Sequence, residues 1–328
     1  MGNEPAVRPR GSPSLAKTAG DRGLRAIDCT SPPQSLTKPE TLAGEADGMR
    51  VRIWGARGSV PVSGSEFRRY GGNTACVEVM CGGRTLIFDA GTGIRPAGLQ
   101  LMKEGVRDVR LFFSHFHYDH VLGLPFFAPL YDCSIGVQVW TGLPDVMSTE
   151  EMLRELMRPP WFPVGIGICS ASLDARNFRS GDVLHPWPEV TVRTGTLNHP
   201  GGCIGYRVEF AGRAVALIFD TEHVDGAPDE NVLALINDAD LVIYDAAYTD
   251  EEMTKHRGFG HSTWQEGVRL CKSAGVRKLA LFHHDPFRTD ADLAKIEAMA
   301  KASLPGAFAA RDGQVLEFTA ARAKQKGG

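Results

Sequence analysis

One short segment constrains the fold of this chain more than any other. It is the heptapeptide SHFHYDH at 114–120, which directly follows an apolar run at 109–113. Such a run, ending at polar residues, is typical of a buried strand. In the extended chain beyond the strand, residues two apart point the same way, so His115 and His117 can hold one ion. Asp119 and His120 then face another direction and can hold a second. We therefore expect a metal site, suited to zinc, iron or manganese, at one edge of a sheet.

From residue 50 onward the chain alternates between strand and helix patterns. Overlapping capping-box patterns at 262–265 and 263–266 predict a helix start there. This mixture of elements predicts one layered α/β domain over 49–320. Strands are expected at 51–54, 76–81, 85–88, 109–113, 137–141, 190–196, 204–210, 214–219, 241–244 and 278–282, and helices at 148–158, 230–237, 262–274 and 290–303.

Three later residues that can bind metal also stand at the ends of predicted strands. His199 follows the strand at 190–196, Asp220 ends the one at 214–219, and His283 ends the one at 278–282. Each alone would be an ordinary loop residue, but their common placement favours one shared rim. The other histidines without such a placement, His185, His223 and His256, are expected at the surface or in loops.

In this order, HFHYDH followed by His199, Asp220 and His283, the chain resembles the metallo-β-lactamase superfamily over about residues 50–318. The resemblance implies a four-layer αβ/βα sandwich with two divalent metal ions at one edge, with zinc expected and manganese or iron as alternatives. It implies that His115, His117 and His199 hold one ion, that Asp119, His120 and His283 hold the other, and that Asp220 bridges both. His283 is preferred to His284 because it directly follows the strand, and His284 would then lie behind the ligands or face the substrate.

The segment GFGHSTW at 258–264 is similar to the H-S-T element of the superfamily's phosphodiesterase branch. That branch includes tRNase Z, class II cyclic nucleotide phosphodiesterases and phosphoribosyl cyclic phosphodiesterases. The resemblance implies that His261 protonates the leaving oxygen, since imidazole carries a proton near neutral pH, and that Asp119 orients the nucleophile. The alternative for His261 is a helix-terminal residue packed against Trp264. An aspartate at 220, where dinuclear lactamases have cysteine, also favours this branch.

Segments at 54–59, 69–74 and 88–93 look like the N-terminal motifs of the same branch. Within them, Asp89 is a candidate for orienting a ligand histidine, with a plain turn residue as the alternative. Asn73 either caps a turn or lines the site. Asp245, which follows the strand at 241–244, is a further candidate for a residue behind the ligands.

Charge sets our expectation of the substrate. The chain has 36 Lys and Arg against 39 Asp and Glu, a net charge of -3, and 142–189 lacks the Gly- and Lys-rich arm with which tRNase Z enzymes grip tRNA. We therefore expect a phosphodiesterase for a small substrate, a cyclic nucleotide or a phosphoribosyl-type diester, and no long nucleic acid partner. The alternatives are a thioester or lactone hydrolase on the same scaffold and a non-catalytic metal-binding or sensing module.

Both ends of the chain are expected to lie outside the folded domain. Residues 1–48 have no aromatic side chain and balanced charges, which predicts a disordered extension, and 321–328 a flexible tail. Translation from Met49 would remove the extension, so its presence in the mature protein is open. Seven scattered cysteines and the absence of a long apolar run predict a cytoplasmic protein without a membrane span. A homodimer is compatible with the sequence.

Overall fold

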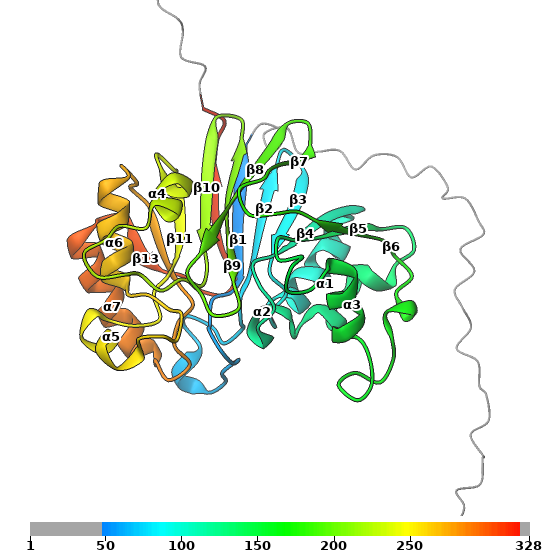
Figure 1. Cartoon of the computed structure of the whole chain (residues 1–328), viewed down its shortest axis with the longest axis horizontal. Helices are drawn as coiled ribbons and strands as arrows, with labels where there is room; N and C mark the ends of the chain where they lie inside the picture. The colour runs from blue at the N-terminus through cyan, green and yellow to red at the C-terminus, as the bar shows by residue number, and fades with distance from the viewer. Residues whose placement is uncertain (1–47, 322–328) are drawn as a thin grey trace, which may run out of the picture. The chain divides into compact units, whose positions relative to one another are not determined.

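The computed structural model describes residues 48–321 of the chain (Figure 1). The extension expected at 1–48 and the tail expected at 321–328 lie outside this range, apart from Gly48 and Ala321. Among residues 48–321, no helix is long and apolar enough to cross a membrane.

The first of two sheets contains seven strands, in the order β14-β1-β2-β3-β4-β5-β6. The four strands from β3 to β6 run parallel, and β2, β1 and β14 extend the sheet with antiparallel pairs. β1 alternates between buried and partly exposed residues, whereas β4 is buried almost throughout, as expected of a strand covered on both faces. The strands are β1 (Met49–Gly55), β2 (Cys76–Cys81), β3 (Arg84–Phe88), β4 (Asp108–Phe113), β5 (Gly136–Thr141), β6 (Ser172–Asn177) and β14 (Gln314–Phe318).

The second sheet also has seven strands, in the order β13-β12-β11-β10-β9-β8-β7. β10, β11, β12 and β13 run parallel, and β7, β8 and β9 extend the sheet with antiparallel pairs. The strands are β7 (Val183–Trp187), β8 (Val190–Leu197), β9 (Cys203–Phe210), β10 (Arg213–Ile218), β11 (Leu241–Asp245), β12 (Leu279–Phe282) and β13 (Ala307–Ala309).

The two sheets face one another and are covered by helices on their outer sides. Their inner faces share one core, in which Ile53 and Val77 from the first sheet belong to the same cluster as Val208 and Leu217 from the second. Separate apolar clusters join α1 and α3 to the first sheet and α4, α6 and α7 to the second (Figure 1). This arrangement confirms the predicted four-layer αβ/βα sandwich.

The helices are the four predicted and three that the sequence pattern did not indicate, at 94–104, 118–121 and 250–256. α6 begins at the second of the two overlapping capping boxes, because the Thr263 side chain accepts the Glu266 N–H, whereas the Ser262 side chain is used elsewhere. The helices are α1 (Ile94–Glu104), α2 (Tyr118–Val121), α3 (Thr149–Leu156), α4 (Glu230–Ile236), α5 (Asp250–His256), α6 (Trp264–Ser273) and α7 (Asp290–Ser303). α1 was missed because Pro96 and Gly98 interrupt its pattern.

Candidate metal centre

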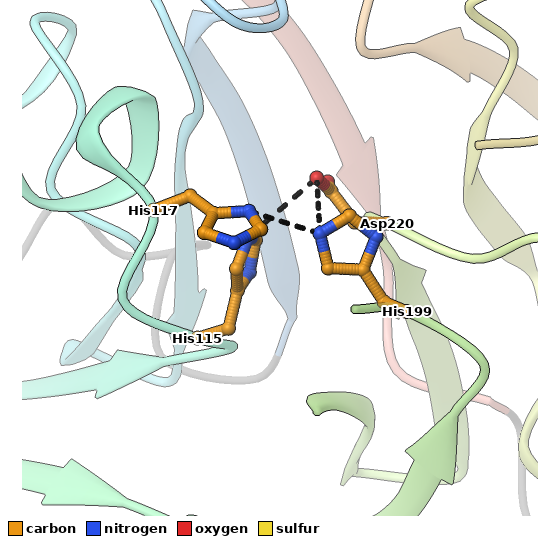
Figure 2. A group of neighbouring side chains, drawn as sticks. All are labelled: His115, His117, His199 and Asp220. Atoms are coloured by element: carbon orange, nitrogen blue, oxygen red, sulfur yellow. Dashed lines mark hydrogen bonds and ion pairs between the residues drawn. The ribbon is translucent and has the colours of Figure 1, made fainter. Parts of the chain in front are cut away.

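The loops beyond four strands bring seven histidine and aspartate side chains into one cluster. Metal-binding atoms of His115, His117, His199 and Asp220 all lie within 4.8 Å of one another (Figure 2). Those of Asp119, His120 and His283 form a second group on the same criterion. These segments follow β4, β8, β10 and β12, so the structure brings together every residue that the sequence nominated as a ligand.

The carboxylate of Asp220 lies between the two groups. Its Oδ2 is 3.6 Å from His115 Nε2, and its Oδ1 is 3.3 Å from His120 Nε2. The same Oδ2 lies 3.3 Å from His283 Nε2. Oδ2 therefore lies close to members of both groups and Oδ1 to the second group, which is the position that a bridging ligand needs.

Backbone groups set the orientation of His199. Its Nδ1–H donates to the Gly260 carbonyl at 2.7 Å, which turns Nε2 toward His117 Nδ1 at 3.0 Å. Residue 260 has to be glycine here, because its φ is +84° and a Cβ would lie 2.3 Å from His199 Nδ1. The carbonyl thus fixes the tautomer that leaves Nε2 available to a metal.

Asp89 contacts His120, a member of the second ligand group, through the ring nitrogen that faces away from Asp220. Its carboxylate accepts the His120 Nδ1–H at 2.7 Å and the Ser114 N–H and hydroxyl, each at 2.7 Å. Asp89 is fully buried and has a φ of +62°, a conformation that few residues other than glycine adopt. Its hydrogen bond to His120 is the contact that the sequence hypothesis requires, and its bonds to Ser114 tie that candidate ligand to the end of β4.

A backbone donor that sequence reasoning missed also reaches the centre. The Ser59 N–H donates to Asp119 Oδ2 at 2.7 Å, and His283 Nε2 lies 3.1 Å from the same oxygen. Ser59 and His283 both have positive φ, at 62° and 57°. The side chain of Arg57 holds the loop that contains Ser59, since it donates to the carbonyls of Gly71 and Arg288. Every residue except proline has a backbone N–H, so sequence patterns could not identify Ser59 as a donor to Asp119.

His261 and Asp245 form a pair at the edge of the cluster. His261 Nδ1 lies 3.0 Å from Asp245 Oδ2, which leaves the other ring nitrogen unbound by this contact. Burial lowers the pKa of His261, but the charge and hydrogen bond of Asp245 together with the charges of Asp220 and Asp119 raise it to about 9. His261 also lines a cavity of about 340 Å³ with Ser59 and Asp119, where a substrate can enter.

The donor set fits divalent metal ions. Buried side-chain atoms of three candidate ligands that face the cluster have no hydrogen-bond partner: His115 Nε2, His120 Nε2 and Asp220 Oδ1. Burial lowers the pKa values of His115, His117 and His199, which favours the neutral imidazole that binds metal. Burial alone would also lower the pKa of His120, but Asp220, Asp119 and Asp89 raise it well above its usual range. Such a concentration of negative charge is what a divalent cation neutralises.

Three other residues lie away from the ligand atoms. The sequence suggested two of them for the site and did not suggest the third. Asn73 donates through Nδ2 to Asp312 at 2.9 Å, so it joins two loops. His284 donates to the Ala310 carbonyl at 2.8 Å and is buried, which gives no support to a substrate-facing position. His223, expected at the surface or in a loop, lies in a loop but is buried, with Nδ1 2.8 Å from the Ser262 hydroxyl.

The chain matches one known family and several curated relatives. The beta-lactamase superfamily domain matches residues 84–284 of the chain. A ribonuclease Z of Gemmatimonas aurantiaca is 26% identical over 289 residues, which cover 72% of this chain and 87% of that protein. A ribonuclease Z of Haloferax volcanii is 26% identical over 322 residues, which cover 82% and 95%.

These relatives correct the expectation that long nucleic acids are excluded as partners. They are named as ribonucleases, so a near-neutral chain of this family is compatible with an RNA substrate. The argument from net charge was wrong because phosphate contacts depend on local charge, and metal ions add positive charge that the sequence does not count.

Solved structures show the same fold. The human short-form tRNase Z superposes with a TM-score of 0.59 at 20% identity, over 81% of this chain and 98% of that one. Since the family match spans more than half of the chain and includes the HFHYDH, His199, Asp220 and His283 segments, the chain belongs to the metallo-β-lactamase superfamily, and its ribonuclease Z relatives place it in the phosphodiesterase branch of metal-dependent hydrolases.

Proposed function

We propose that this chain is a dinuclear phosphodiesterase that uses zinc and cleaves phosphodiester bonds in RNA. The observation that carries the proposal is the pair of ligand groups on either side of Asp220, with His261 beside them. Histidine and carboxylate donors suit zinc, and sites that leave a coordination position open are typical of catalysis.

In the proposed arrangement, His115, His117 and His199 hold one ion and Asp119, His120 and His283 hold the other, with Asp220 between them. When bound, two such ions supply positive charge to the phosphate oxygens and activate a water for in-line attack. The buried carboxylates of Asp89 and Asp245 keep His120 and His261 in fixed orientations.

His261 is the proposed proton donor to the leaving oxygen. Asp245 occupies its Nδ1 side, so the other ring nitrogen is the one that can donate. Asp119 is held by the Ser59 N–H and His283 through one oxygen, and its proposed role is to orient the nucleophile. General acid catalysis by a positioned histidine contributes about 10²- to 10⁴-fold to the rate.

RNA is proposed as the substrate because the relatives that match most of this chain are named ribonuclease Z. The test is turnover of RNA with a 3′ extension, alongside bis(p-nitrophenyl) phosphate, a thioester and a lactone, by protein loaded with defined metals. Cleavage of RNA supports the proposal. Turnover of the thioester or lactone alone would overturn it, and cleavage of only the small diester would remove its RNA part.

His261→Ala separates the two roles that its position allows, since His261 also lies near Asp220 and His283. Lower turnover with unchanged metal content identifies a proton donor, whereas lost metal identifies a ligand. His185→Ala is the matched control, because His185 lies on β7 outside the ligand groups.

A further inference from the structure

The cavity of about 340 Å³ at the metal centre is referred to as the metal pocket. A second cavity, of about 660 Å³, lies directly beside it. Residues of α2, of α3 and of the segments on either side of these helices line it. Five aromatic rings dominate the lining, and we refer to them as the aromatic groove: Phe116, Tyr118, Phe126, Trp161 and Phe162. Phe126 and Phe162 meet edge to face, with ring centroids 6.1 Å apart.

The aromatic groove continues into the metal pocket. Phe116 and Tyr118 line both cavities, and they alternate with the candidate ligands His117 and Asp119 along the chain. The two cavities are therefore adjacent, and a molecule bound at the metal centre needs to pass only these two rings to reach the groove.

Three of the five rings of the groove are exposed, and Phe116 and Phe162 are partly buried. The exposed fractions are 77% for Tyr118, 75% for Trp161 and 58% for Phe126. A contiguous group of exposed large apolar side chains marks a binding surface, since it gains from being covered. Rings that present their faces to solvent are also suited to stacking against other planar groups.

The groove offers little to a phosphate group. Glu155 is the charged residue among those that line it, and its carboxylate already accepts the Arg158 Nε–H at 2.7 Å. The favoured occupant is therefore uncharged, planar and connected to a group that reaches the metals. Nucleobases have these properties, and their phosphates would remain at the metal pocket.

We propose that the aromatic groove binds nucleobases of a single-stranded segment of the substrate, next to the phosphodiester that is cleaved. This inference rests on the proposed function, because it places the phosphate at the metal centre. Stacking of a base on an aromatic side chain is tolerant of sequence, so the groove would recognise unpaired RNA without strong base preference.

The test is a binding measurement that needs no turnover. The affinity of the full chain is measured for a phosphorothioate oligoadenylate and for an abasic oligomer with the same number of phosphates. We expect tighter binding of the oligoadenylate. Trp161→Ala should weaken it by about 5- to 150-fold, the effect of losing one stacked base, and leave the abasic oligomer unchanged. Trp161→Phe should retain most of the affinity.

Two controls keep the inference separable from folding and from chemistry. Phe126→Ala should act like Trp161→Ala, whereas Leu99→Ala, at an exposed apolar residue of α1 outside the groove, should have no effect.

Equal binding of both oligomers by the unmodified chain would overturn the inference, even if the chain cleaves phosphodiesters. Base-dependent binding without any turnover would support the groove and count against the proposed chemistry. If Trp161→Ala instead dissociates a dimer and leaves base-dependent binding intact, the groove is a subunit contact and the inference fails.

Discussion

Asp245 Oδ2 lies 3.0 Å from His261 Nδ1 and accepts the backbone N–H of Thr221 at 3.1 Å. The other oxygen, Oδ1, accepts the Ala247 N–H at 3.2 Å. The carboxylate is thus fixed by the backbone on both sides, and it fixes the imidazole in turn. His261 is positioned by the end of β11, although it belongs to the segment before α6.

Asp245→Asn should lower turnover and shift its pH dependence. A proton donor works in its protonated form, so the rate falls as pH rises through the pKa of His261. The negative charge of Asp245 raises that pKa, and its removal should move the alkaline limb of the turnover profile to lower pH. The measurement is kcat against pH at constant metal content, with the exposed Asp145→Asn as control. An unchanged alkaline limb would contradict the role of Asp245.

Asp89→Asn should weaken metal binding by about 10- to 100-fold, as is typical when the partner of a ligand histidine is lost. Asparagine tolerates a positive φ, so the backbone at 89 is expected to remain in place while the charge beside His120 is lost. Competition with a chelator of known affinity measures the change. Unaltered affinity would show that Asp89 serves the fold rather than the metal centre.

The number of bound metal ions should depend on which candidate ligand is replaced. We expect two zinc ions per chain, loss of one in His117→Ala, and weaker binding of both in Asp220→Asn, because its oxygens face both groups. Elemental analysis after dialysis checks this, with His185→Ala as control. A full complement of metal in Asp220→Asn would exclude a bridging role.

Removal of metal should also lower thermal stability. Ions that bind only the folded chain stabilise it by about 4 kcal/mol when their free concentration is a thousandfold above Kd. Unfolding followed by circular dichroism with and without chelator measures this shift in Tm. The shift should shrink in Asp220→Asn, and a shift of equal size there would mean that the chelator acts elsewhere.

Asp312 should make stability depend on pH independently of the metal centre. Burial raises its pKa to about 6 from an ordinary value of 3.8, against hydrogen bonds from Asn73 and Gly72 that favour the charged form. A raised pKa means that the contribution of Asp312 to stability is full below pH 3.8 and is lost as pH rises through 6. The free energy of unfolding relative to Asp312→Asn should therefore fall by about 2–3 kcal/mol between these limits. Denaturant unfolding at both ends of this range tests it, and a constant difference would contradict it.

The sequence predicted the fold and the cluster of candidate ligands because both depend on local patterns. Apolar runs mark the strands, and His115, His199 and His283 stand directly beyond them. α1 was missed because Pro96 and Gly98 break its pattern, although Pro96 lies within the first turn, where proline is tolerated.

Other features could not be predicted because they depend on contacts between distant segments. Ser59 reaches Asp119 through its backbone, and His223 is buried by its contact with Ser262. Substrate size was inferred wrongly from net charge, since whole-chain charge does not describe the surface near the metals. Nothing in the spacing of Phe116, Phe126 and Trp161 indicates that they line one groove.

β1 and β14 pair in antiparallel register, with Val51 opposite Leu316. The first sheet therefore joins two strands that lie at 49–55 and 314–318 and are made far apart in time. During translation β1 emerges first, and one of its edges stays unpaired until β14 has left the ribosome. Folding of this domain consequently depends on the arrival of β14, and a chain that stops before β14 is left with an unpaired strand edge that is prone to aggregation.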